Sequence, residues 1–158
     1  MTDWREHILR AHAARAHEKR PEFRKGASPE RLRRLEDEVG LRIPTPLREL
    51  LRVSDGVEEE LLINGEWMIT HASVWTCDEI ETQNLALHFG QQTPLAPAES
   101  PGATPFYFAG AGVDGILFAF LVDPSDAEDP AVYGYYPMER EWSRISPSLE
   151  EHLRGWKV

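Results

Sequence analysis

Residues 28–57 read SPERLRRLEDEVGLRIPTPLRELLRVSDGV, and this stretch decides the first half of the fold. Ser28 followed by Pro29 combines an N-cap with proline at the first helical position. Leu32, Leu35 and Val39 then recur at helical spacing before Gly40, which is a stop signal. The pattern predicts a helix between Ser28 and Gly40.

Thr45-Pro46 repeats the same start signal a few residues later. It predicts a short helix with Thr45 as its cap, ending at Ser54-Asp55-Gly56, whose buried stripe is Leu47, Leu50 and Leu51. Upstream, residues 3–24 are rich in Ala, Arg, Glu and Leu and predict an amphipathic helix that frays near Pro21 and is closed by Gly26. We therefore expect residues 1–27 to form an N-terminal helical extension and residues 28–158 to form the main domain.

Downstream, the spacing of apolar residues changes from that of a helix to that of a strand. Asn64-Gly65 between two apolar triplets predicts a β-hairpin over residues 60–70, because both turn residues tolerate positive φ. Thr76 and Glu79 form a capping box that opens a helix to about Leu87, and residues 91–105 predict an ordered, proline-rich loop. Three apolar strands (106–109, 116–122 and 132–136) and a helix capped by Ser146-Pro147 complete the chain.

The order of helices, then strands, then a helix lacks the regular alternation of a doubly wound fold. It predicts an α+β fold, with a mostly antiparallel sheet flanked by N-terminal and C-terminal helices.

Charge is polarised along the chain. Residues 1–52 hold 13 of the 17 basic and 9 of the 27 acidic residues, whereas Val53 to Glu139 contains 15 carboxylates and no Lys or Arg. Such a field repels nucleic acid and anionic membranes and attracts a basic protein. The alternative is an acidic surface that serves only solubility.

The chain length, the cysteine content and the hydropathy further restrict the class of protein. The chain is one domain in length, and its one cysteine, Cys77, has no partner for an internal disulfide and no zinc-site spacing. No signal-peptide core or apolar run of 18 residues occurs in the sequence, so we expect a cytoplasmic protein.

Residues 110–115, GAGVDG, match the G-x-G-x-x-G dinucleotide motif by letter. That motif must open a helix that receives a pyrophosphate, but the following residues 116–122 are typical of a strand. We expect a glycine-rich connection between strands, with at least one of Gly110, Gly112 and Gly115 at positive φ.

No other motif indicates a metal-binding or catalytic site. His7, His12 and His17 spread around a helix, and the Asp123, Asp126 and Asp129 spacing is not that of an EF-hand. No catalytic signature is found, so we expect no catalysis, no metal and no cofactor. Core packing is the default for Trp4, Trp75 and Trp156, whereas Trp67 and the group Tyr133, Tyr135, Tyr136 and Trp142 are candidates for a binding surface.

Read in order, these features resemble the SUKH superfamily, which includes yeast cell-wall synthesis regulators and bacterial immunity proteins. The residues that carry the resemblance are Leu35-Glu36, Gly40, Ile43-Pro44, Leu47 to Leu51, Asp55-Gly56, Ile80, Asn84, the segment PFYFAGAGVDGILFAF and the closing SPSLEEHLRGW. The similarity spans about Ala27 to Trp156, and the chain has Asp114-Gly115 where many members have Gly-Asp. It implies an α+β fold and a protein that binds a cognate secreted toxin, often a nuclease, and blocks it without chemistry.

Three functions stay open: a toxin-neutralising immunity protein, an interaction scaffold in signalling or cell-envelope regulation, and a small-ligand or nucleotide-processing enzyme that uses the glycine loop. The first is favoured by the resemblance together with the acidic middle. On charge and exposure, the expected contacts with a basic partner are Asp55, Glu58, Glu59, Glu60, Glu66, Trp67, Asp114, Asp126, Glu128 and Asp129.

Overall fold

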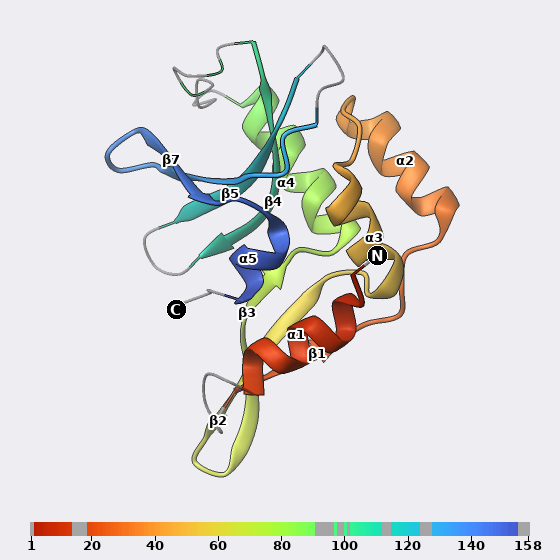
Figure 1. The fold of residues 1–158 in the computed structure, drawn as a ribbon, viewed down its shortest axis with the longest axis vertical. Helices are drawn as coiled ribbons and strands as arrows, with labels where there is room; N and C mark the ends of the chain where they lie inside the picture. Colours follow the sequence, from red (N-terminus) through yellow and green to blue (C-terminus); the bar gives the residue numbers. More distant parts are fainter. Residues whose placement is uncertain are drawn as a thin grey trace.

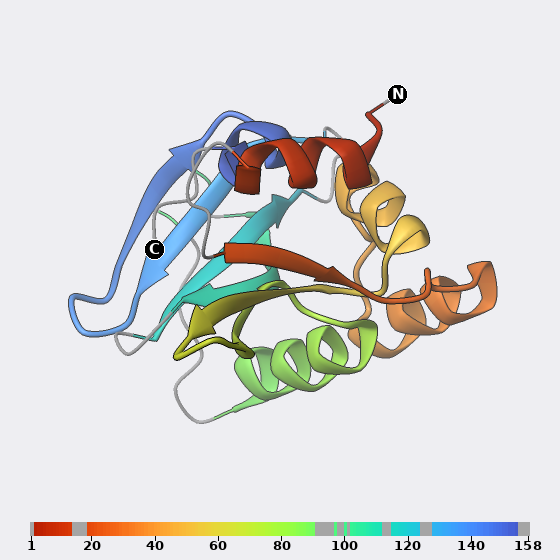
Figure 2. The ribbon, with the colours of Figure 1, turned by 90° about the horizontal axis from the view of Figure 1, so that it is seen from below.

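Two antiparallel β-sheets form the centre of this computed structural model (Figure 1), which describes residues 2–13, 19–90, 97, 100, 102–111, 115–123 and 128–154. The first sheet has the strand order β1-β2-β3 and the second β4-β5-β6-β7. Figure 2 shows α1 on one side of the sheets and α4 on the other. The elements are α1 (Trp4–Ala13), β1 (Lys19–Phe23), α2 (Pro29–Val39), α3 (Thr45–Val53), β2 (Val57–Ile63), β3 (Glu66–Val74), α4 (Cys77–Phe89), β4 (Thr104–Ala111), β5 (Ile116–Val122), β6 (Val132–Tyr136), β7 (Glu141–Ser146) and α5 (Leu149–Arg154).

The predicted α+β class with antiparallel strands and terminal helices is confirmed, but the strands are divided between two sheets. The sheets meet where the Trp75 N–H donates to the Phe108 carbonyl at 2.8 Å. Phe108 lies at an irregularity of the β4–β5 ladder, between Tyr107 and Ala109. Within the described residues, the backbone link between the sheets is therefore a hydrogen bond at a β-bulge and not a continuous ladder.

The predicted N-terminal helix is present as α1, but the prediction was wrong for residues 19–23. Residues 19–23 form a strand, β1, that pairs antiparallel with β2. Pro21 suits this position because an edge strand tolerates the missing N–H. Gly26 does not close a helix; a Cβ there would lie 1.9 Å from the Arg52 carbonyl oxygen, so the residue allows the chain to pass against the end of α3.

The predicted helices α2 and α3 are confirmed. The Ser28 hydroxyl accepts the Arg31 N–H, and Gly40 ends α2 at φ 77°. The predicted cap of α3 was wrong: Pro44 holds the cap position and Thr45 lies inside the helix. Thr45 instead donates its N–H to the Glu128 carboxylate.

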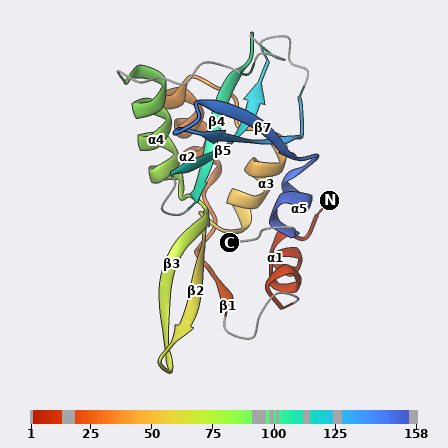
Figure 3. The same cartoon turned by 90° about the vertical axis from the view of Figure 1, so that its left-hand side faces the viewer.

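The predicted hairpin is the joined β2 and β3, with Asn64 at φ 51° and Gly65 at φ 81° in its turn. It projects from the rest of the molecule (Figure 3). The capping box of α4 is present as predicted, and the helix runs to Phe89, two residues past Leu87.

The glycine segment connects β4 to β5, and Gly115 has φ 67°, so the predicted strand-to-strand connection is confirmed. Strand β7 was not predicted. The last helix begins later than predicted, because Ser148 and not Ser146 accepts an N–H of its first turn, from Glu151. Residues 91–96 of the predicted loop and Trp156 lie outside the described residues.

Helices and sheets share one core. Phe106, Phe108 and Phe120 pack with residues from every helix of the described chain, including Trp4 from α1 and Leu149 from α5. Trp4 is 3% exposed, as predicted for a core residue. Residues of the N-terminal segment thus complete the same core as the main domain.

Candidate partner-binding surface

The acidic run Glu58-Glu59-Glu60 lies on β2, beside the cationic strand β1. Glu60 pairs with Arg20 at 2.5 Å, and Glu58 pairs with Arg24. The Glu58 carboxylate raises the pKa of Arg24 through this hydrogen bond and its charge. Cations from the N-terminal segment therefore pair with carboxylates of this run, which in the sequence alone is an acidic stretch without neighbouring cations.

Glu59 is the most buried member of the run, with a side chain that is 1% exposed. His12 Nε2 lies 3.0 Å from one carboxylate oxygen and Lys19 Nζ 3.9 Å from the other. The other ring nitrogen of His12 lies 3.0 Å from the Ile8 carbonyl oxygen, which fixes the ring. Glu59 thus ties α1 to the hairpin.

Trp67 and Glu66 lie nearer the tip of the hairpin. The Arg20 guanidinium stacks over the Trp67 ring at 4.1 Å, so this half-buried tryptophan has a cation over one face. Glu66 is exposed beside the turn. Of the predicted hairpin contacts, Glu66 is the most accessible to a partner.

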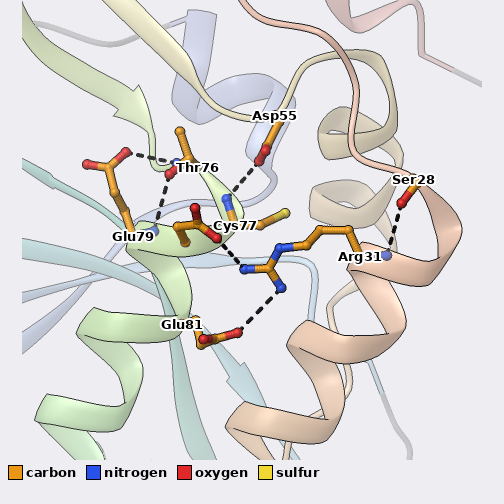
Figure 4. A network of polar contacts seen from close by, with 8 residues as sticks. Ser28, Arg31, Asp55, Thr76, Cys77, Glu79 and Glu81 are labelled. Atoms are coloured by element: carbon orange, nitrogen blue, oxygen red, sulfur yellow. Dashed lines mark hydrogen bonds and ion pairs between the residues drawn. The ribbon is translucent and has the colours of Figure 1, made fainter.

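Asp55 has a structural role at the start of α4 (Figure 4). Its carboxylate accepts the Cys77 N–H at 2.7 Å, next to the Thr76 and Glu79 capping box. Burial, with a smaller effect from Asp55, raises the pKa of the Cys77 thiol to about 12. A fully buried thiol with this pKa is inert, which agrees with the expectation of a packed hydrophobe.

The same region joins α2 to α4. Arg31 donates to Asp78 at 2.7 Å and to Glu81 at 3.4 Å (Figure 4). These ion pairs link α2 to α4, while the Asp78 side chain stays 90% exposed.

A cavity of about 270 Å³ lies between the α2–α3 linker and the end of β5. We call it the acidic hollow, because its lining contains three carboxylates and one cation: Arg42, Ile43, Pro44, Thr45, Leu121, Val122, Asp123, Glu128 and Asp129. Glu128 and Asp123 are exposed. Asp129 accepts the Ala131 N–H at 2.9 Å and the Tyr133 hydroxyl at 3.1 Å, which holds its carboxylate in place.

The predicted contact residues are thus found in separate places. The hairpin lies at one end of the long axis, and the end of β5 lies toward the other (Figure 1). Asp114 and Asp126 lie outside the described residues. Arg42 and Asp123 line the hollow but were not among the predicted contacts, and only a spatial arrangement joins them, since they are far apart in sequence.

The predicted aromatic surface is partly formed. Tyr135 and Trp142 are half-buried, with ring centroids 5.1 Å apart, and Trp142 stacks on the buried Tyr107 at 6.1 Å. Tyr135 lies on β6 and Trp142 on the neighbouring edge strand β7 of the second sheet.

Within the described residues, no three His, Cys, Asp or Glu side chains converge in a way that suits a metal ion. In the same part of the chain, no helix has the length and apolar character needed to cross a bilayer.

Comparison with known proteins adds the family. No curated protein matches the chain. The model of the SMI1/KNR4 family (SUKH-1) matches residues 26–155, close to the span of the resemblance noted in the sequence. α1 and β1 precede this match, so the cations that pair with β2 come from outside the part that the family model covers. With its family match and its α+β fold, this chain belongs to the SMI1/KNR4 family (SUKH-1).

Proposed function

We propose that this protein binds a cognate bacterial toxin inside the producing cell and blocks it without catalysis, with the acidic hollow as the central contact. Membership of a family that includes immunity proteins supports this role. A net charge of −10 favours a basic partner, such as a nuclease, because opposite charges speed encounter. We also propose that residues 28–158 are the toxin-binding SUKH-like domain and residues 1–27 an attached extension.

The observation that carries the proposal is the composition of the hollow. Its concave lining has Asp123, Glu128 and Asp129 against the single cation Arg42, so it suits a Lys or Arg side chain of the toxin. Asp123 and Glu128 are exposed, whereas Glu58 and Glu60 on the hairpin are only 14% and 13% exposed. We keep the ten predicted contacts as the proposed set and rank the hollow residues first.

The test begins with the full chain, tagged and purified from its native cell, to capture the partner. The partner is then expressed alone and with this protein. We expect growth arrest in the first case and rescue in the second. A captured partner that is harmless when expressed alone would contradict toxin neutralisation and favour the scaffold hypothesis.

Variants then locate the contact. Asp123→Asn with Glu128→Gln removes two charges from the hollow and keeps the shape of both side chains, including an oxygen that accepts the Thr45 N–H. The matched control removes two exposed charges at the β6–β7 turn, Glu139→Gln with Glu141→Gln. We expect association with the captured toxin to slow about tenfold for the hollow variant, a loss that added salt reduces, and less than about twofold for the control. Equal rates for the two double variants would exclude the hollow as the contact.

A further inference from the structure

The two edges of the first sheet differ in their protection against pairing with another strand. β1, at one edge, carries Lys19, Arg20 and Pro21, which are residues that discourage edge-to-edge pairing. β3, at the other edge, has no Lys, Arg or Pro from Trp67 to Val74, and no strand in the described part of the chain pairs with its outer side. Met68 and Ile69 on this edge are 51% and 60% exposed. Register shifts interrupt the β2–β3 ladder at Thr70 and Ser73, so the regular part of this edge is Glu66 to Ile69. An apolar edge segment with exposed backbone groups is a template for another strand.

The backbone of β3 offers its free groups in a defined register. Asn64-Gly65 is a two-residue turn, so Ile63 and Glu66 form a hydrogen-bonded pair, and the two kinds of pair alternate along the ladder. Leu62–Trp67 and Glu60–Ile69 are therefore non-hydrogen-bonded pairs, in which the two residues do not bond to each other through their backbones. It follows that Trp67 and Ile69 direct their N–H and C=O groups away from β2, toward the open edge.

We propose that two copies of this chain pair antiparallel through β3, about a two-fold axis at Met68, to form a continuous six-stranded sheet. In this register Trp67 lies opposite Ile69 of the second copy, and the two residues exchange both backbone hydrogen bonds. Residues 67 and 69 share one face of the strand by alternation, so the pairing also joins apolar side chains on one face. Met68 lies opposite Met68 of the second copy on the other face.

Charge and shape favour a second copy over a basic protein at this edge. The carboxylates of the hairpin base, Glu58 and Glu60, already pair with Arg24 and Arg20. The paired segment Trp67 to Ile69 of each copy carries no charge, so no like charges are opposed in the proposed register. The hairpin projects from the body of the molecule (Figure 3), which leaves the two bodies at opposite ends of the joined hairpins. The end of β5, whose residues line the acidic hollow, lies toward the other end of the long axis (Figure 1), so the dimer leaves the hollow open.

Salt distinguishes this pairing from toxin binding. Each copy carries a net charge of −10, so long-range repulsion opposes the dimer and salt relieves it. Binding of a basic toxin has the opposite dependence on salt. The dimer is also measured on the purified protein alone, so its failure is independent of the proposed function.

The first experiment is sedimentation velocity of the full chain over a range of concentrations, at salt of about 0.05 M and about 0.5 M. We expect a monomer–dimer equilibrium that shifts toward the dimer at high salt. Ile69→Lys should raise the dissociation constant at least about tenfold, because it places a charge at the centre of the paired edge. The control is Met138→Lys, at a position that is 83% exposed and lies in the β6–β7 turn. A protein that is monomeric at both salt concentrations, or a dimer that Ile69→Lys leaves unchanged, would overturn the proposal.

The second experiment tests the register. Met68→Cys should form a disulfide between copies under mild oxidation, because opposite residues at the axis have Cα atoms about 4.5 Å apart, within the range of a disulfide. Ile63→Cys is the matched control: it is 41% exposed, on β2, one strand farther from the axis. The native Cys77 is fully buried and does not compete. Equal cross-linking of the two variants would rule out this register.

Discussion

The side-chain amide of Asn84 makes two hydrogen bonds to the backbone of Tyr107: Nδ2 donates to the carbonyl at 2.8 Å, and Oδ1 accepts the N–H at 2.9 Å. The amide thus occupies the edge of β4 in the way that a neighbouring strand would. Both residues are buried, so water does not replace these bonds. This contact, made by α4, ends the second sheet at β4.

Replacing Asn84 by Ala should therefore lower the free energy of unfolding by about 3 kcal/mol, because a buried N–H and a buried C=O of Tyr107 lose their partners. Gln83→Ala, on an exposed position of the same helix, should change it by less than about 0.5 kcal/mol. Urea unfolding measures both. Similar values for the two variants would mean that the amide does not replace a strand in stabilising this edge.

The acidic run on β2 should respond unequally to loss of charge. Glu59→Gln leaves His12 and Lys19 beside a buried neutral amide, and we expect a loss of about 3 kcal/mol in the free energy of unfolding. Glu58→Gln and Glu60→Gln face arginines that are about half exposed, so each should cost less than about 1 kcal/mol. Equilibrium denaturation in urea tests the order. If all three variants lose the same stability, the internal pairing does not differ along the run.

Substitution of Gly115 should destabilise the protein because of the backbone conformation at this position and not because of a steric clash. It has φ 67° and no atom within 4 Å of a Cβ, so Gly115→Val introduces strain and no clash. We expect a cost of about 1–3 kcal/mol in thermal or urea unfolding. Gly102→Val is the control, because that position is also open and has no positive φ. An equal cost at the two glycines would refute the backbone explanation.

His88 should make stability depend on pH. Its Nε2 lies 2.8 Å from the Pro105 carbonyl oxygen, and burial lowers its pKa from the usual 6.5 more than this bond raises it. The unfolded chain then binds the proton first as pH falls below about 6.5, so the stability that neutral His88 provides is present above that pH and lost below it.

His88→Gln retains a donor for the Pro105 carbonyl and removes the titration. We expect the wild type to lose more free energy of unfolding than this variant between pH 7.5 and pH 5.5, two values that bracket the ordinary histidine pKa of about 6.5. The other histidines are common to both proteins and cancel in the comparison. The same loss in both proteins would mean that His88 does not contribute to the pH dependence.

Sequence by itself determined the elements whose signals lie within a few residues. The cap at Ser28, the left-handed Gly40, the Asn64-Gly65 turn and the Thr76–Glu79 capping box all involve hydrogen bonds or backbone angles set by near neighbours. Because such signals are local, they predict α2, the hairpin and the start of α4. The ordered set also sufficed to indicate the family.

Only the tertiary structure decided which charges remain available. Glu58, Glu59 and Glu60 are matched by residues 34, 47 and 40 positions earlier. Arg20 lies on a strand, β1, that the helical composition of residues 3–24 concealed. Arg42 and Glu128 line one cavity, the acidic hollow, although more than half of the chain's length separates them in sequence. Ion pairs carry no period and no fixed spacing along a sequence, so the charge that a surface shows depends on which distant segments the fold brings together.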